Sequence, residues 1–258
     1  MKMKQSKFFY VTLTAIVLFG LGLLIQFTMP QIHGLGVAGV CLLMLYIMLT
    51  AVGCSRVGWD YFIVSMNELP AQQNGSSKRI ALTFDDGPTF NSANILDILK
   101  QHNVPATFFL VGQRVEQQPE LARRMLAEGH SIGNHTQAHG HLINFKETKG
   151  MMDEITACNQ AIEQHMGIQT TLFRAPHGVL TLHLSRAIHR LGMRSIGWNL
   201  RSFDTSAKDA DLLLHRITSK LQNRAIILLH DDCDITAQIL PKIIEHARAQ
   251  GYEFDVIR

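Results

Sequence analysis

Residues 80–88 read Ile-Ala-Leu-Thr-Phe-Asp-Asp-Gly-Pro, an apolar run that ends in two adjacent aspartates and a Gly-Pro pair. Short runs of apolar and β-branched residues predict buried strands, and Gly-Pro marks a turn. Asp85 and Asp86 therefore leave the carboxyl end of a predicted strand. In barrels and open α/β sheets alike, that end of the strands is where sites form.

The same pattern of strand, turn and helix repeats to the C-terminus. Further strands are predicted near residues 107–111, 131–133, 171–173, 194–198, 225–229 and 254–257. Amphipathic helices are predicted between them, at residues 93–101, 119–128, 146–165, 182–191, 209–221 and 235–249. This alternation indicates a parallel α/β architecture, either a barrel or an open sheet, with about seven strands.

The first sixty residues have a different composition. No Asp, Glu, Lys or Arg occurs from residue 8 to residue 55. Residues 8–29 and 35–54 form two apolar runs, each close to the ~20 residues that a helix needs to cross a bilayer core. The first run is longer than the apolar stretch of a cleavable signal peptide, and residues 30–34 predict a turn. We therefore expect a membrane anchor over residues 1–60, a polar linker over 61–78 and a catalytic domain over 79–258.

Positive charges at the ends of the apolar runs predict the orientation of the anchor. Lys2, Lys4 and Lys7 precede the first run and Arg56 follows the second, whereas the turn carries no Lys or Arg. Cytoplasmic flanks are rich in such residues, so both ends are expected on the cytoplasmic side of a bacterial inner membrane. Alternatively, the second run is an interfacial or buried helix, which would place the domain outside the cell.

Overall composition argues against nucleic acid as a partner. Charged residues make up 17% of the 258 residues, the hydrophobic class reaches 47%, and the net charge is only +3. No basic stripe interleaved with aromatic residues is present. The low charge favours a membrane protein instead.

Unusual polar residues follow five of the predicted strands. They are Asp85 and Asp86, His135 and His139, Arg174, the stretch from Asn199 to Asp204, and His230 with Asp231. Because parallel strands end at one edge of a sheet, we expect these side chains to lie close together. Two imidazoles and one carboxylate form a known zinc ligand set that leaves a position open for water. His135 and His139 would be two ligands and either Asp85 or Asp86 the third, with the other aspartate as general base and His230 as general acid.

Four segments resemble the successive motifs of the polysaccharide deacetylases, which are carbohydrate esterase family 4 or the NodB-homology domain. They are Thr83-Phe84-Asp85-Asp86-Gly87-Pro88, His135-Thr136-Gln137-Ala138-His139, Arg174-Ala175-Pro176-His177-Gly178 and Leu228-Leu229-His230-Asp231. They occur in the family's order and cover residues 79–258. The resemblance implies a distorted (β/α) barrel of about seven strands.

The resemblance also implies a role for each residue. Asp85 would be the general base, and Asp86, His135 and His139 would bind one divalent metal, commonly zinc, with cobalt or nickel as substitutes. Arg174 would orient Asp85, and Asp204 would orient His230, the general acid. The substrate would meet Pro176, His177, Gly178 and Leu228, with a backbone N–H near His177 stabilising the oxyanion and Leu228 lining the acetyl pocket.

Two positions depart from the family pattern. His177 stands where an aromatic residue is usual, and Asp204 is followed by Thr205 rather than by tryptophan. Both positions shape the sugar groove, so the substrate is expected to be atypical. We expect a hydrolase that removes an N-acetyl group from an amino sugar, on a lipid-linked or membrane-proximal glycan. Alternatives are an extracytoplasmic deacetylase of peptidoglycan or another envelope polysaccharide, an O-deacetylase, and an inactive carbohydrate-binding domain of the same fold.

Overall fold

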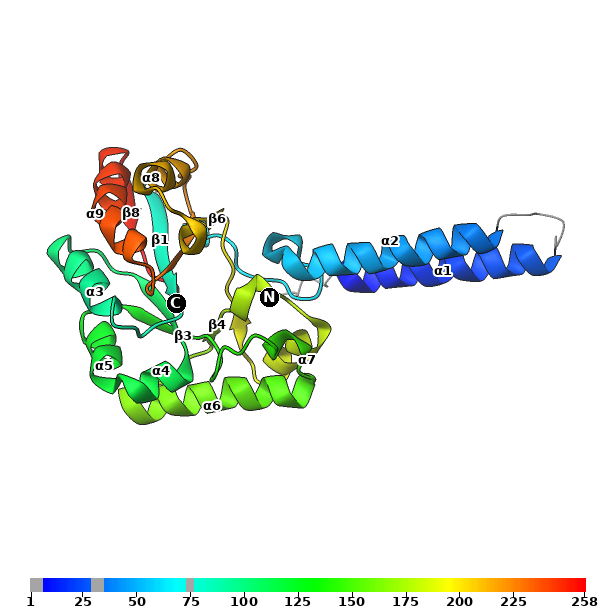
Figure 1. The fold of residues 1–258 in the computed structure, drawn as a ribbon, viewed down its shortest axis with the longest axis horizontal. Helices are drawn as coiled ribbons and strands as arrows, with labels where there is room; N and C mark the ends of the chain where they lie inside the picture. The colour runs from blue at the N-terminus through cyan, green and yellow to red at the C-terminus, as the bar shows by residue number, and fades with distance from the viewer. Residues whose placement is uncertain (1–6, 29–34, 73–76) are drawn as a thin grey trace.

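One parallel sheet carries the polar residues, and a helical hairpin projects from the domain that contains it (Figure 1). The computed structural model describes residues 7–28, 35–72 and 77–258. Seven strands follow the order β5-β4-β3-β2-β1-β7-β6, and β8 pairs with the first residues of β1. Their bounds are β1 Lys78–Asp85, β2 Thr107–Leu110, β3 Ser131–Asn134, β4 Leu172–Phe173, β5 Arg194–Ser195, β6 Leu200–Arg201, β7 Ile226–His230 and β8 Tyr252–Phe254.

The sheet curves into a half-barrel, and a segment from outside it pairs with residues next to the edge strand β5 and next to β7. Met66 forms a parallel bridge with Ile196 beyond β5, and Glu68 forms an antiparallel bridge with Ala225 before β7. The Met66 amide donates to the Ser195 carbonyl at 2.9 Å, and the Leu69 amide donates to the Arg224 carbonyl at 2.9 Å. The predicted distorted (β/α) barrel is confirmed.

Helices cover the outer face of the sheet (Figure 1). They are α3 Ser92–Gln101, α4 Gly112–Gln117, α5 Pro119–Ala127, α6 Thr148–Met166, α7 Leu182–Arg190, α8 Ala210–Thr218 and α9 Asp234–Ala249. The sequence analysis missed α4 and β6, and it placed the last strand at residues 254–257 instead of 252–254. Strand β6 comes just after the predicted strand at residues 194–198, and one of its two residues is exposed, so no separate apolar run marks it. Strand β8 is positioned by its partner residues 78–80.

Alternation along β1 decides which side chains enter the barrel. Ile80, Leu82 and Phe84 belong to the main core cluster, together with apolar side chains of the outer helices. Since successive side chains of a strand point to opposite faces, Thr83 and Asp85 point into the barrel. The same strand thus builds the core with one face and the candidate site with the other.

The hairpin consists of α1 Lys7–Thr28 and α2 Leu35–Ser55. Both helices are long and apolar enough to cross a membrane, with mean hydropathies of 2.4 and 2.3, and their large apolar side chains are mostly exposed. Figure 1 shows the hairpin extending away from the α/β domain. The predicted turn at residues 30–34, and Lys2 and Lys4, lie outside the described residues.

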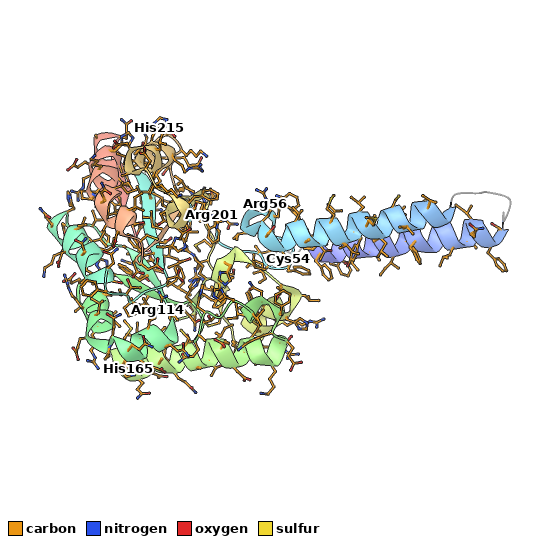
Figure 2. The ribbon with its side chains drawn as sticks, viewed as in Figure 1. Cys54, Arg56, Arg114, His165, Arg201 and His215 are labelled. Atoms are coloured by element: carbon orange, nitrogen blue, oxygen red, sulfur yellow. The ribbon has the colours of Figure 1, made fainter. Side chains whose placement is uncertain are left out.

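The near end of the hairpin is packed onto the domain. The Phe8 amide donates to the Tyr61 carbonyl at 2.8 Å, and the Tyr61 hydroxyl lies 3.0 Å from the Thr50 hydroxyl. Tyr61 and Phe62 are buried, and the Phe8 and Phe62 rings are 4.6 Å apart. Figure 2 labels Cys54 and Arg56 at this junction. Residues after α2 therefore hold both helices against the domain.

Candidate active site

The strand register brings the candidate catalytic residues to one edge of the sheet. Asp85 pairs with His230 across β1 and β7, and with Phe109 across β1 and β2. Beyond β3, the His135 amide donates to the Leu110 carbonyl at 2.9 Å, and the Arg174 amide donates to the Asn134 carbonyl at 3.0 Å. Parallel pairing places these strand ends side by side, so residues about 145 positions apart meet at one site.

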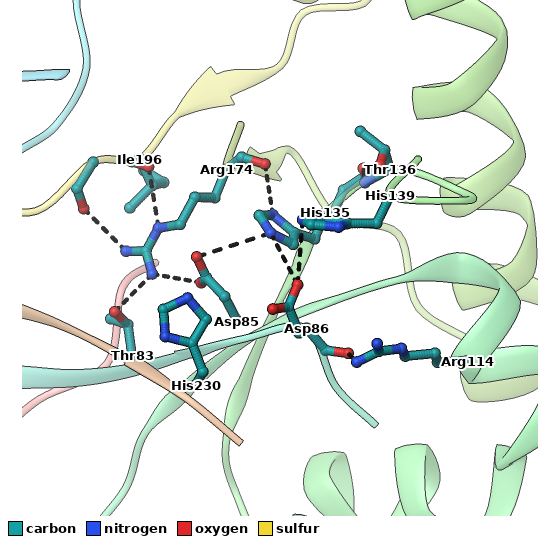
Figure 3. A network of polar contacts seen from close by, with 12 residues as sticks. Thr83, Asp85, Asp86, Arg114, His135, Thr136, His139, Arg174, Ile196 and His230 are labelled. Atoms are coloured by element: carbon teal, nitrogen blue, oxygen red, sulfur yellow. Dashed lines mark hydrogen bonds and ion pairs between the residues drawn. The ribbon is translucent and has the colours of Figure 1, made fainter. Parts of the chain in front are cut away.

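Asp86, His135 and His139 form a cluster that can hold one metal ion. Their ligand atoms all lie within 4.8 Å of one another. Asp86 Oδ1 is 3.6 Å from His135 Nε2 and 3.3 Å from His139 Nε2 (Figure 3). This carboxylate oxygen is buried and has no hydrogen-bond partner among the described residues. A buried oxygen without a partner is costly, and a cation between the three side chains would satisfy it.

Hydrogen bonding orients one of the two imidazoles, and burial favours the neutral form of the other. His135 Nδ1 donates to the Arg174 carbonyl at 2.8 Å, so Nε2 keeps its lone pair and points toward Asp86. Burial, reinforced by the nearby charge of His135, lowers the pKa of His139 to about 4. Burial alone would raise the pKa of Asp86, but the nearby histidines, in their charged form, lower it below its ordinary value. A donor set of two imidazoles and one carboxylate fits a divalent ion, which binds imidazole in its neutral form.

Backbone strain separates the two adjacent aspartates. Asp86 has a φ of 77°, in the left-handed region that non-glycine residues rarely adopt. This conformation turns Asp86 toward the histidines while Asp85 stays on the strand. Thr136, His139 and His177, in the neighbouring loops, also have positive φ angles, of 69°, 49° and 58°. Such strain gathers at functional sites, where the surrounding structure holds it.

Arg174 holds the Asp85 carboxylate from the barrel interior. Its Nη1 donates to Asp85 Oδ1 at 2.7 Å and to the Thr83 hydroxyl at 2.7 Å. The other guanidinium nitrogens donate to the carbonyls of Ile196 and Gly197, at 3.3 and 3.0 Å. Burial lowers the pKa of Arg174 from its ordinary value, and the charge of Asp85 opposes this effect. Asp85 Oδ2 remains directed toward His135, with 3.9 Å between Oδ2 and Nε2.

Asp204 and His230 form a second pair on the other side of Asp85. His230 Nδ1 lies 2.8 Å from Asp204 Oδ1, and the His230 amide donates to Oδ2 at 2.7 Å. Ser202 and Thr236 donate their hydroxyl groups to the same carboxylate. Burial would lower the pKa of His230, but the bond to Asp204 and its charge prevail and raise it to about 9. The raised pKa favours the protonated form of His230 at neutral pH. Because Nδ1 is bonded to Asp204, Nε2 is the ring nitrogen that can donate a proton to a substrate.

The four predicted substrate contacts lie around this centre. Pro176 and Gly178 are buried in the loop after β4, and the His177 ring is 4.6 Å from the His139 ring. A Cβ atom at Gly178 would come within 2.6 Å of the Trp198 ring, so only glycine fits there. Leu228 is buried and shares its face of β7 with His230 by strand alternation.

Glu154 is a site-supporting residue that the sequence analysis missed. Its carboxylate is buried on α6 and accepts hydrogen bonds from the amides of Gln137 and Ala138, at 3.1 and 2.9 Å. It thereby holds the loop that carries both histidines. The signal was an acidic residue on the apolar face of α6, next to Ile155 and Cys158, where a solvated charge is out of place.

The hairpin is hydrogen-bonded to the segment that follows Gly178. The Leu180 amide donates to the Cys54 carbonyl at the end of α2, with a length of 2.8 Å. Val57, which follows the helix, is buried near Gly178 and Gly197. The segment that leaves α2 is therefore part of the wall behind the Arg174–Gly178 loop.

Comparison with known proteins agrees with the fold. The polysaccharide deacetylase family model matches residues 72–196. The peptidoglycan-N-acetylglucosamine deacetylase PgdA of Listeria monocytogenes is 34% identical over 195 residues, which cover 75% of this chain and 41% of that protein. A chitooligosaccharide deacetylase of Rhizobium leguminosarum bv. trifolii is 34% identical over 179 residues, covering 65% of this chain and 79% of the relative.

Solved structures show the same similarity in three dimensions. The peptidoglycan deacetylase PdaC from Bacillus subtilis superposes with a TM-score of 0.66 at 32% identity, covering 70% of this chain and 89% of that one. The structure is a half-barrel with an Asp-His-His cluster at the carboxyl edge of its sheet. The chain belongs to the polysaccharide deacetylase family. It spans 41% of the length of the Listeria relative.

Proposed function

We propose that this protein is a metal-dependent hydrolase that removes an N-acetyl group from an amino sugar. The observation that carries the proposal is the Asp86–His135–His139 cluster with its unsatisfied buried oxygen, flanked by Asp85 and His230. An inactive carbohydrate-binding domain of the same fold would not need this ligand set. The names of the relatives, which are deacetylases of N-acetylated glycans, support the same reaction.

The cluster would bind the metal through Asp86 Oδ1 and the two imidazole Nε2 atoms. A divalent ion held there, for which we expect zinc with cobalt or nickel able to substitute, would acidify a water molecule and polarise the amide carbonyl. Glu154 and the Arg174 carbonyl support the geometry by fixing the histidine loop and the His135 tautomer. Such supporting partners matter for both affinity and activity.

Asp85 is assigned as the general base. One carboxylate oxygen is held by Arg174, and the other faces the metal cluster, where it can accept a proton from the attacking water. Because Asp85 does not need to bind the ion, its carboxylate keeps the basicity that proton transfer requires. Arg174 keeps the carboxylate in one orientation and is a positioning residue.

His230 is assigned as the general acid. Its proton would pass from Nε2 to the leaving nitrogen as the C–N bond breaks, and the products are acetate and a free amine. Asp204 accepts the hydrogen bond from Nδ1 and stabilises the charged imidazole. A backbone N–H near His177 would donate to the oxyanion, and Leu228 would line the acetyl pocket.

The hairpin suggests a membrane-proximal substrate. We propose that α1 and α2 span the membrane and that the domain faces the cytoplasm, since Lys7 and Arg56 lie at the near ends of the two helices. The bond between Cys54 and Leu180 would then keep the substrate loop close to the bilayer. A lipid-linked glycan fits this placement. If the domain lies outside, the substrate is peptidoglycan or another envelope polysaccharide.

Removing the metal tests the proposed reaction. Chelation of the purified full-length protein is expected to abolish deacetylation of a neutral chitooligosaccharide, and added zinc should restore it. His139→Ala should lose both the ion and the activity, as measured by elemental analysis and acetate release. His141→Ala is the matched control, because His141 is exposed and lies outside the cluster. Activity that survives chelation in protein without a bound divalent ion would contradict the proposal.

A reporter fusion tests the topology. Alkaline phosphatase fused after Arg258 is expected to be inactive, because this enzyme works only outside the cytoplasm, whereas a fluorescent protein at the same position should be bright. The positive flanks of the hairpin are the physical reason. An active phosphatase fusion would reverse the orientation and favour the envelope-polysaccharide alternative.

A further inference from the structure

A second concave surface lies beside the candidate active site. A groove of about 710 Å³ runs between the loop after β6 and helix α8. Its lining includes Phe203, Lys208, Leu212, His215, Arg216 and Lys220. Figure 2 labels Arg201 and His215 on this part of the domain. None of these residues belongs to the Asp86–His135–His139 cluster.

The groove has a strong excess of positive charge. Among the ion pairs between described residues, none involves the lining cations Lys208, Arg216 and Lys220. Arg201, which is outside the lining but packs on the lining residue Phe203, has no such ion pair either. The one acidic residue of the lining, Asp209, accepts a hydrogen bond from the Leu212 amide at 2.9 Å and caps α8. Single exposed cations are ordinary, but several unpaired ones along a concave surface concentrate a field that attracts anions.

Phe203 is in contact with two of these cations. The guanidinium carbons of Arg201 and Arg216 lie 4.7 and 4.9 Å from the centroid of its ring. Phe203 has a φ of 65°, which is strained for a bulky residue, and its side chain is 44% exposed. These contacts hold both guanidinium groups against an exposed ring, where they remain free to bind an anion in the groove.

The groove is connected to the candidate proton donor. Phe203 directly precedes Asp204, which accepts the hydrogen bond from His230 Nδ1. The Ser206 hydroxyl donates to the Phe203 carbonyl at 3.2 Å and closes the same turn. The loop that lines the groove therefore also carries the hydrogen-bond partner of His230, which connects the groove to the candidate site.

We propose that this groove binds the phosphate or diphosphate group of an anionic, phosphate-linked glycan whose sugar is deacetylated at the neighbouring site. The deacetylation in this inference rests on the proposed function, whereas binding of an anion by the groove does not depend on it. Guanidinium groups match the geometry of phosphate oxygens, and the additional lysines suit an anion with more than one charge. Leu212, which is 69% exposed, and the Phe203 ring provide apolar contact next to the anion.

Direct titration tests anion binding without any need for activity. Inorganic diphosphate added to the full-length protein in detergent at low salt is expected to bind, as measured by calorimetry, and binding should weaken as salt increases. Arg201→Gln combined with Arg216→Gln should weaken it about tenfold or more, since charge-assisted hydrogen bonds are lost. Arg186→Gln, an exposed arginine on α7, is the matched control and should leave binding unchanged. Equal binding by the parent and the double variant, or no binding by the parent, would overturn the proposal.

Kinetics then test the connection with the substrate. The double variant should raise KM for a diphosphate-linked N-acetylglucosamine about tenfold, while KM and kcat for a neutral chitooligosaccharide stay within about twofold of the parent. Comparison of a soluble diphosphate-linked sugar with a polyprenyl-diphosphate-linked one separates a soluble source from a lipid carrier. If KM and kcat changed equally for the neutral and the anionic substrate, the two substitutions would merely disturb the loop after β6. That result would overturn the assignment of the groove. If the parent deacetylated no substrate, the proposed function would fail, and the titration would still decide whether the groove binds anions.

Discussion

Asp85→Asn is expected to retain the bound metal and to lower kcat by about 10²–10⁴-fold, the usual contribution of a general base. An amide cannot accept the proton of the attacking water. Its oxygen can still accept the hydrogen bond that Arg174 donates to Asp85 Oδ1, so the site should keep its shape. Acetate release gives the rate, and elemental analysis gives the metal content.

Asp86→Asn should have the opposite signature. Asp86 Oδ1 faces both histidines, so its loss should weaken metal affinity, and excess ion should partly restore activity. Metal loss in Asp85→Asn with retention in Asp86→Asn would reverse the two assignments. Near-parental turnover by both variants would show that the hydrolytic mechanism itself is wrong.

Folding must be checked for Asp85→Asn, because this residue is the counter-charge of a buried arginine. Breaking a buried ion pair by removing one partner typically costs about 3–5 kcal/mol. Arg174 keeps its hydrogen bonds to Thr83 and to two carbonyls, which limits the effect. Thermal unfolding and circular dichroism of both variants separate lost stability from lost catalysis.

His230→Ala is expected to lower kcat by about 10²–10⁴-fold, the range for a general acid, and added imidazole should partly restore it. The parent enzyme should lose activity as the pH rises toward about 9, because the pKa of His230 is raised to about 9 and only its protonated form can donate. A divalent cation at Asp86 disfavours the proton on His230. The alkaline limb of the pH–activity profile should therefore lie at or below a pH of about 9.

Asp204→Asn should move the alkaline limb to lower pH by a unit or more. Burial alone lowers the pKa of His230, and the bond to the Asp204 carboxylate is what raises it above its ordinary value. A purely structural role for Asp204 would lower the rate at every pH without moving the limb. His246→Gln, an exposed histidine on α9, is the control and should leave the profile unchanged. An alkaline limb that stays in place in both Asp204→Asn and His230→Ala would exclude His230 as the group that titrates.

Local patterns in the sequence determined the architecture and the kind of site. The uncharged runs flanked by Lys7 and Arg56 indicate two membrane-length helices, and the strand before Asp85 shows where the carboxyl edge begins. The predicted strands and apolar helices are found because both depend on short runs of neighbouring residues. The missed strand β6 marks the limit of that approach, since its one buried and one exposed residue come just after another predicted strand and form no apolar run of their own.

Only the tertiary structure decided how the site residues are oriented. Arg174 and Asp85 are 89 positions apart, and residue types alone left open which aspartate faces the histidines. The φ of 77° at Asp86 and the carbonyl that orients His135 decide it in the fold. Glu154 also acts at a distance along the chain, from the buried face of a helix. Such contacts depend on the register of parallel strands and on burial, which arise when the whole sheet assembles and are not encoded in any single segment.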